Sequence, residues 1–248
     1  MSLKFDHLVH FSTSLSTVAE KFSSLGFHAV KGGSHPSWGT YNSLCYFSGL
    51  RYIEWIGIQN LSIASTSDNL LIQQLVEDSF KGEGFSQIAF RTDNIDNLAI
   101  RLSAQGFNTI GPVQGSRMKE DGTLLKWSML FINDQQYRFP FFIQWGQPDM
   151  ERNLQLGPMT IHENGTPTLS YIGYAVKDAP SFASNFCRII ESKRLHIYQT
   201  YSEIHIEDFA IRFYEKEGTH RPILVGITGV LEDNIVDVAG GSYHLTRV

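Results

Sequence analysis

The feature that most constrains the fold is an internal repeat. Three segments share one pattern: FDHLVHFSTSLSTVAEKFSSLGF from residue 5, FSQIAFRTDNIDNLAIRLSAQGF from residue 85, and LSYIGYAVKDAPSFASNFCRIIES from residue 169. Each begins with an alternating apolar stretch typical of a β-strand and continues through a polar junction into a short helix. The first two copies stop at the same dipeptide, Gly26-Phe27 and Gly106-Phe107. Glycine suits the left-handed position after a helix, so the same unit is predicted in each copy.

The sequence after each helix repeats as well. Residues 39–59 predict two strands joined by a tight turn at Ser48-Gly49, and residues 122–147 predict the same pair with a longer turn. The two stretches align at their ends, where IEW (residues 53–55) stands beside IQW (residues 143–145). Each unit is therefore predicted to be a βαβββ module.

These modules define the expected domain organisation, an α+β protein built from repeated βαβββ units. Residues 1–60 and 85–147 form a pair, so residues 1–147 are expected to make one domain. Residues 148–168, rich in Gly, Pro and Asn, are expected to be a linker. Residues 169–248 are expected to form a third, degenerate module whose last strand lies in residues 222–229, followed by an added tail.

Composition and charge narrow the range of partners. The 248 residues carry a formal net charge of −5 and no cluster of Lys and Arg, which argues against nucleic-acid binding. No stretch approaches the roughly 18 apolar residues of a membrane span, and no signal peptide is evident, so a cytoplasmic protein without a membrane partner is expected. If the protein self-associates, a symmetric homodimer is the general expectation.

The repeated modules resemble the glyoxalase-like domain proteins of the vicinal oxygen chelate (glyoxalase/bleomycin resistance/dioxygenase) superfamily. The resemblance is carried by DHLVHF, HPSWGTYNSLCYF, YIEWIG, GFSQIAFRTDNID, DGTLLKW and FFIQWG. It implies paired modules that enclose a cleft for a small oxygenated molecule, with metal-assisted lyase or isomerase chemistry as one expectation. Because fold does not fix function, a non-catalytic small-molecule binding or sequestering protein is the alternative, and whether the chain is an enzyme stays open.

Strand alternation separates the two histidines of DHLVH. His7 and His10 fall on opposite faces of a regular strand, so they cannot converge on one metal ion. His7 aligns with Gln87 and Tyr171, on a side with small and polar residues that suggests a cleft lining. His10 aligns with aromatic residues in the other copies and is predicted to be a packed core residue.

The resemblance implies a ligand set on the first and last strands of the paired modules, namely His7, Glu54, Gln87 and Gln144. An imidazole, a carboxylate and two amide oxygens could hold Mn²⁺, Fe²⁺, Ni²⁺ or Zn²⁺ with room for substrate oxygens. His7 and Glu54 would be the catalytic residues, with Glu54 as a ligand or a general base. The family pattern usually has a second acid or histidine where the glutamines stand. A metal-free cleft is therefore an equal alternative.

Further polar residues are candidates for substrate binding. Asn42 shares the parity of Thr40 within its strand, and His35 and Trp38 lie on the preceding loop, where binding residues often gather. Three basic side chains could anchor an anionic group, since arginine suits carboxylate or phosphate: Arg91, Arg117 and Lys126. Turn formation or exposure to solvent explains the same residues without a ligand.

Overall fold

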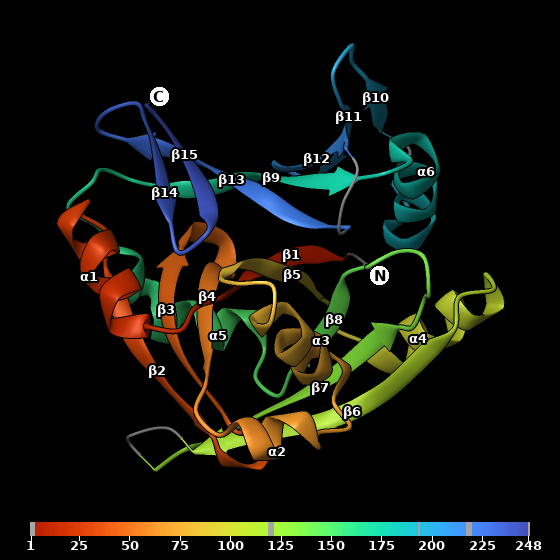
Figure 1. Ribbon diagram of the computed structural model, residues 1–248, viewed down its shortest axis with the longest axis horizontal. Helices are drawn as coiled ribbons and strands as arrows, with labels where there is room; N and C mark the ends of the chain where they lie inside the picture. Colours follow the sequence, from red (N-terminus) through yellow and green to blue (C-terminus); the bar gives the residue numbers. More distant parts are fainter. Residues whose placement is uncertain (1–2, 119–121, 193, 217–219, 248) are drawn as a thin grey trace.

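The computed structural model describes residues 3–118, 122–192, 194–216 and 220–247, and contains two curved β-sheets (Figure 1). The larger sheet has eight strands in the order β2-β3-β4-β1-β5-β8-β7-β6, and the smaller has seven in the order β10-β11-β12-β9-β13-β15-β14. The predicted α+β class with repeated modules is confirmed. Among the described residues, no helix has both the length and the apolar composition that crossing a membrane requires.

The first two modules build the larger sheet. The first consists of β1 (Lys4–Phe11), α1 (Leu15–Ser24), β2 (Ala29–His35), β3 (Thr40–Phe47) and β4 (Arg51–Ile58), with short 3-10 turns η1 (Pro36–Trp38) and η2 (Ser48–Leu50). The second consists of β5 (Gly84–Arg91), α4 (Ile95–Ala104), β6 (Thr109–Met118), β7 (Leu124–Ile132) and β8 (Phe141–Trp145). They join through the antiparallel pair β1–β5, and the sheet curls so that its edge strands β2 and β6 approach each other.

The connection between these modules fills part of the curl. It contains α2 (Leu61–Ser65) and α3 (Leu70–Ser79), and Figure 1 shows α3 within the curved larger sheet. Leu71, Ile72 and Leu75 of α3 are buried in a cluster with Val9 and Phe141 from the concave face of the sheet. The helix therefore occupies space that two facing modules would otherwise leave open.

The smaller sheet differs from the predicted third module. It contains β9 (Thr168–Val176), α6 (Ala179–Ile190), β10 (Leu195–Ile197), β11 (Ser202–Ile206), β12 (Phe209–Glu215), β13 (Arg221–Val230), β14 (Asn234–Val238) and β15 (Gly241–Arg247). The third module ends at β12, which runs parallel to β9 as β4 does to β1. The assignment of residues 222–229 as its last strand is wrong, because β13 pairs antiparallel with β9 and parallel with β15. Strands β13 to β15 therefore form a fourth unit that has no helix, called the fourth half-module below. An added tail was expected for the end of this segment.

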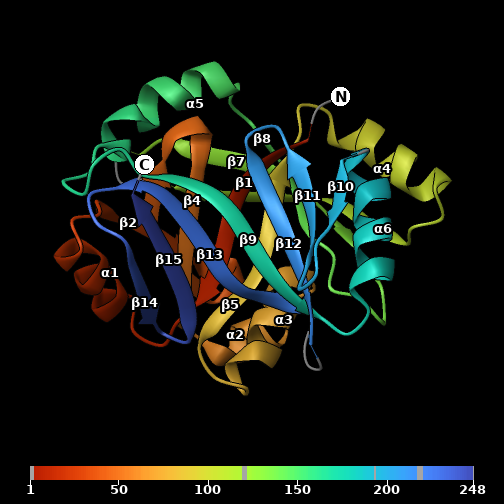
Figure 2. The same ribbon diagram turned by 90° about the horizontal axis from the view of Figure 1, so that it is seen from above.

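The two sheets share one hydrophobic core. The smaller sheet lies across β1, β4 and β5 (Figure 2), and the Phe5 ring of β1 stacks on Phe209 of β12 with ring centroids 4.0 Å apart. The segment 148–168, expected as a linker, contains α5 (Asp149–Leu156) and the 3-10 turn η3 (Gly157–Thr160). Both of these contribute to the site described below.

The His10 side chain connects the two sheets through hydrogen bonds and ring contacts. Its Nε2 donates to the Ala239 carbonyl oxygen (2.7 Å), so its Nδ1 accepts a hydrogen bond from the Tyr243 hydroxyl, which in turn accepts one from Trp55 Nε1. The imidazole is fully buried and packs edge-on against Phe85. Burial lowers the pKa of His10 to about 4, outweighing the hydrogen bond to Ala239. His10 is therefore a neutral packing residue, in agreement with the strand alternation.

This burial makes stability depend on pH. Because the folded-state pKa lies below that of an exposed histidine, the unfolded chain takes up the proton first as pH falls below about 6.5. Urea unfolding should show the free energy of unfolding decreasing by about 3 kcal/mol between pH 6.5 and pH 4, with His10 as a main source. In His10→Phe this decrease should be smaller, against a lower stability at pH 7. An equal slope in variant and wild type would show that His10 is not the source.

Candidate active site

A cavity of about 600 Å³ lies on the concave side of the larger sheet. Its walls come from the strands of the first module, from β7 and β8, from α3, and from α5 with η3. Three tryptophans line it, Trp38, Trp127 and Trp145, with the rings of Trp127 lying 5.9 Å from those of both others. The cavity therefore offers a largely aromatic surface to a small molecule.

A β-bulge in β1 places His7 at the cavity wall and the fully buried Asp6 directly behind it. Phe5 pairs with Phe90 and His7 with Ala89, so Asp6 is the extra residue on the β1 side. His7 lines the cavity, and Asp6 accepts a hydrogen bond from Trp145 Nε1 (3.2 Å), which also lines it. Phe5 instead packs in the core between the sheets. Simple alternation predicted Asp6 and His7 on opposite faces, and the bulge overturns this.

Asp6, His7 and Glu54 form a chain of buried titratable groups. Asp6 Oδ1 lies 2.7 Å from His7 Nδ1, and His7 Nε2 lies 3.6 Å from Glu54 Oε2. Burial acts to raise the pKa of Asp6, but the charge of Arg152, the hydrogen bond with His7 and the charge of Arg91 outweigh it and hold that pKa below its usual value. An ionised carboxylate only accepts hydrogen bonds, so His7 Nδ1 is the donor and Nε2 faces Glu54.

Asn42 holds Glu54 in place from the neighbouring strand. Asn42 Nδ2 donates to Glu54 Oε1 (2.6 Å), and Asn42 Oδ1 accepts from the Gly33 backbone N–H (2.8 Å). A Cβ atom at Gly32 would lie 2.0 Å from Asn42 Oδ1, and one at Gly33 would lie 2.3 Å from Arg117 Nη1. These glycines, predicted to form a turn, stand within β2 and leave room for both side chains. One oxygen of Glu54 is thereby fixed and the other is directed at His7.

Six of the ten predicted site residues lie at this cavity: His7, Glu54, Asn42, His35, Trp38 and Arg117. His35 is buried beside the tryptophans, with Nδ1 3.2 Å from Thr40 Oγ1. Burial lowers the pKa of His35, with Glu54 acting in the opposite direction and Arg117 in the same direction. The grouping of these six residues at one cavity supports the predicted cleft, in which the strands meet the loop that precedes β3.

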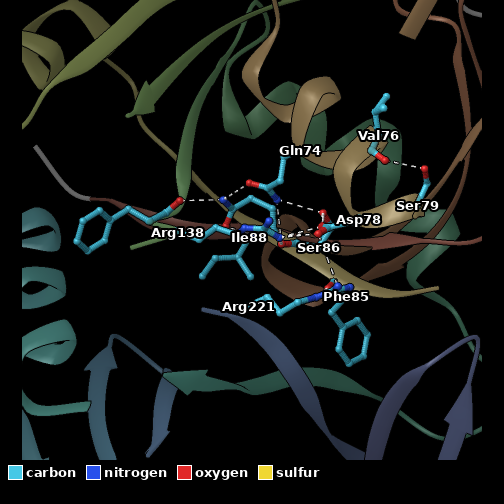
Figure 3. Close-up of polar contacts among 11 residues, drawn as sticks. Gln74, Val76, Asp78, Ser79, Phe85, Ser86, Ile88, Arg138 and Arg221 are labelled. Carbon is cyan, nitrogen blue, oxygen red and sulfur yellow. Dashed lines mark hydrogen bonds and ion pairs between the residues drawn. The ribbon is translucent and has the colours of Figure 1, made fainter. Parts of the chain in front are cut away.

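Gln87 and Gln144 do not join His7 and Glu54. Gln87 lies beneath α3, where its Nε2 donates to the Phe139 carbonyl (2.8 Å) and to Gln74 Oε1 (3.3 Å). Figure 3 shows Gln74 in a polar network with Asp78, Ser86 and Arg138. The insertion of α3 thus separates Gln87 from the cavity.

Gln144 points to the opposite face of β8. Its Oε1 accepts from the Ile95 backbone N–H at the start of α4 (2.8 Å). Phe141, Ile143 and Trp145 are the β8 residues that line the cavity. The strand register explains the error: Val9 pairs with Glu54, but its counterpart Ala89 pairs with Phe141. The similar letters IEW and IQW therefore stand three positions out of register, and Trp145 lines the cavity.

Two predicted cationic residues also lie elsewhere. Arg91 is buried, but its guanidinium donates to Asp149 Oδ2 (3.0 Å) and to the carbonyls of Phe5 and Gly49. Lys126 is exposed on β7 and alternates with Leu125 and Trp127, which line the cavity. Strand alternation in β7 therefore directs the lysine to the outer face.

Sequence reasoning missed Arg152 and Tyr46. Arg152 of α5 lines the cavity, is 4% exposed, and stacks its guanidinium over the Trp145 ring at 4.4 Å. Tyr46 of β3 also lines the cavity, and burial raises its pKa to about 12, against the opposing charges of Arg117 and Arg152. Arg152 was missed because it lies in a segment expected to be a linker, and Tyr46 lies in the HPSWGTYNSLCYF motif without being singled out there.

Comparison with known proteins identifies the family of this chain. The model of the glyoxalase-like domain matches residues 5–190. The chain belongs to the glyoxalase-like domain family, within the vicinal oxygen chelate superfamily.

Solved structures add the likeness of fold. A hypothetical protein from Staphylococcus aureus superposes with a TM-score of 0.88 at 21% sequence identity, over 99% of this chain and 100% of that one. Methylmalonyl-CoA epimerase from Mycobacterium tuberculosis covers 60% of this chain and 91% of its own, at 18% identity and a TM-score of 0.44. No curated protein matches the sequence. The first likeness shows the fold, and the second is too distant to carry an argument.

The donors of this glyoxalase-like domain do not fit the expected divalent metal. Of the four predicted ligands, only His7 Nε2 and Glu54 Oε2 face each other, and catalytic zinc sites use three protein ligands. His7 Nδ1 is held by Asp6, and the described ranges contain no group of three or more His, Cys, Asp and Glu side chains with metal-binding geometry. No catalytic step is therefore assigned to a metal ion.

Elemental analysis tests the conclusion that these donors do not hold a divalent metal ion. Protein purified without chelator and then dialysed with Mn²⁺, Fe²⁺, Ni²⁺ or Zn²⁺ should carry well under one ion per chain, because two donors bind such ions weakly. His7→Ala and Glu54→Ala should leave the metal content unchanged. One tightly bound ion per chain, lost in both variants and kept in the exposed control Glu20→Gln, would contradict this assessment of the site.

Proposed function

We propose that this glyoxalase-like protein is a lyase or isomerase that moves a proton on a small oxygenated molecule held in the cavity. The observation that carries the proposal is the buried Asp6–His7–Glu54 chain, which reaches the cavity wall at Glu54 and His7. Buried titratable groups aligned within hydrogen-bond reach are the usual equipment of general acid–base catalysis. The tryptophan-lined walls would exclude water from the reacting atoms.

Glu54 is the proposed proton acceptor. Its Oε1 is held by Asn42, so Oε2 is the oxygen available to a proton on a substrate carbon next to a carbonyl group. His7 Nε2, 3.6 Å from that oxygen, is too distant for a direct hydrogen bond and close enough for a substrate atom to contact both groups.

His7 is the proposed second proton carrier. Asp6 fixes the imidazole through Nδ1, which leaves Nε2 to donate to or accept from the substrate. A proton that Glu54 takes from one carbon can thus be returned by Glu54 to the same or a neighbouring carbon, while His7 Nε2, which carries no proton at rest, accepts one from a substrate hydroxyl and passes it to the neighbouring oxygen. An isomerisation balanced in this way needs no oxidant, reductant or co-reactant.

A non-catalytic binding protein is the second candidate. The observation that favours it is that both Glu54 oxygens already face partners, Asn42 and His7, in an aromatic cavity. A fixed acceptor of this kind would suit a protein that retains a small molecule without altering it. Binding without proton exchange distinguishes the two candidates.

Proton exchange at carbon tests the proposal. The protein is incubated in D₂O with mandelate, lactate or glyceraldehyde, and loss of the C–H signal is followed by ¹H NMR. Exchange above the uncatalysed rate is expected for a compound that binds, and Glu54→Gln should slow it by about 10²–10⁴-fold, because the amide keeps the shape and cannot accept the proton.

The matched control is Glu20→Gln, a change at an exposed position of α1 that should exchange at the wild-type rate. Binding of these compounds without exchange in wild type would leave the binding-protein candidate. Unchanged exchange in Glu54→Gln would remove Glu54 from the mechanism.

A further inference from the structure

The cavity contains a cationic group that the proposed proton transfer does not use. Arg152 is almost completely buried on α5, with its guanidinium packed on Trp145, and its Nη1 makes no hydrogen bond to any residue that the structure describes. Buried donors are nearly always paired in folded proteins, since an unpaired one costs the full desolvation of the group. Arg152 also lines the cavity, so its guanidinium is a positive charge at the wall whose Nη1 lacks a hydrogen-bond acceptor among the described residues.

The neighbouring carboxylates do not supply that acceptor. Asp6 Oδ2 lies 3.6 Å from Arg152 Nη1 and Asp149 Oδ1 lies 3.8 Å from it, both beyond hydrogen-bond distance. Asp6 Oδ2 already accepts from Trp145 Nε1, and Asp149 Oδ2 accepts from Arg91 Nε. Both acids form ion pairs with Nη1 at these distances, which balance its charge without supplying a hydrogen bond.

We infer that the substrate is a small carboxylate, whose anionic group binds the Arg152 guanidinium while its neighbouring oxygenated carbon lies at His7 and Glu54. This inference rests on the proposed function, because it names the substrate class of the same cavity. Asp6 connects the two positions, since it contacts His7 through Oδ1 and lies beside Arg152 through Oδ2. An arginine held flat on an aromatic ring is well suited to a planar carboxylate.

The rest of the cavity agrees with an anion that has an apolar body. Arg117 enters from β6 and adds a second positive charge to the wall. The tryptophan rings provide apolar surface for the remainder of the molecule. A 2-hydroxy or 2-oxo acid with an aromatic or aliphatic substituent combines these features.

Equilibrium binding of matched acids and amides tests the inference. Mandelate and lactate are each compared with their uncharged amides, mandelamide and lactamide, by calorimetry and by tryptophan fluorescence. Wild-type protein should bind at least one acid about 10-fold or more tightly than its amide, because a hydrogen bond to a charged partner is stronger than one to a neutral group. Arg152→Met should lose that preference.

The control is Arg188→Met, which also removes an arginine stacked on an aromatic ring, Phe107, on the exposed side of α6. It should keep the wild-type preference. The inference is overturned by equal binding of acid and amide in wild type, by an unchanged preference in folded Arg152→Met, or by tighter binding of inorganic phosphate than of either acid.

Should Arg152→Met fail to fold, a crystal structure of wild-type protein with mandelate decides the question. A mandelate carboxylate within hydrogen-bond distance of the Arg152 guanidinium supports the inference, and one bound elsewhere contradicts it. Because these measurements need no turnover, the anion preference can hold where the exchange experiment fails, so the two proposals are tested separately.

Discussion

The contact between Asp6 and His7 depends on one extra residue in β1. Without the bulge, the two side chains would lie on opposite faces of the sheet, one in the core and one in the cavity. With it, the carboxylate of Asp6 lies behind the imidazole, and Trp145, Arg91 and Arg152 surround it. A fully buried carboxylate is costly unless it is paired, so this arrangement of donors is what allows Asp6 to remain ionised. The orientation of His7, and through it the geometry at Glu54, follows from that pairing.

Two segments outside the repeated modules shape the cavity. Helix α3, between the first and second modules, covers Gln87 and fills the half of the curl that belongs to the second module. Helix α5, after the second module, brings Arg152 to the half that belongs to the first. Two similar modules therefore give one asymmetric site, with His7 and Glu54 on the first module and mostly apolar residues on the second.

The sequence predicted the fold through its repeats, because recurring apolar alternation and helix stops specify the same module wherever they occur. The family resemblance also placed His7 and Glu54 together, because it assigns the ligand set to the first and last strands of the paired modules. Gln144 was misplaced because letter similarity at the end of β8 does not follow the hydrogen-bond register of β5 and β8. Arg152 and the bulge at Asp6 could not be predicted, since each depends on contacts between distant segments that no local pattern encodes. The fourth half-module was missed for a related reason: without a helix, β13 resembles the end of the third module.

The protonation of His7 is the measurement that tests this account most directly. Nitrogen chemical shifts of ¹⁵N-histidine protein, with His7 assigned by comparison with His7→Gln, report which ring nitrogen carries the proton. The account predicts a proton on Nδ1 at neutral pH, retained because Asp6 is an ionised acceptor, and a loss of this preference in Asp6→Asn. An Nε2-protonated ring with a bare Nδ1 in the wild-type protein would contradict the Asp6–His7 contact, and with it the assigned roles of His7 and Glu54.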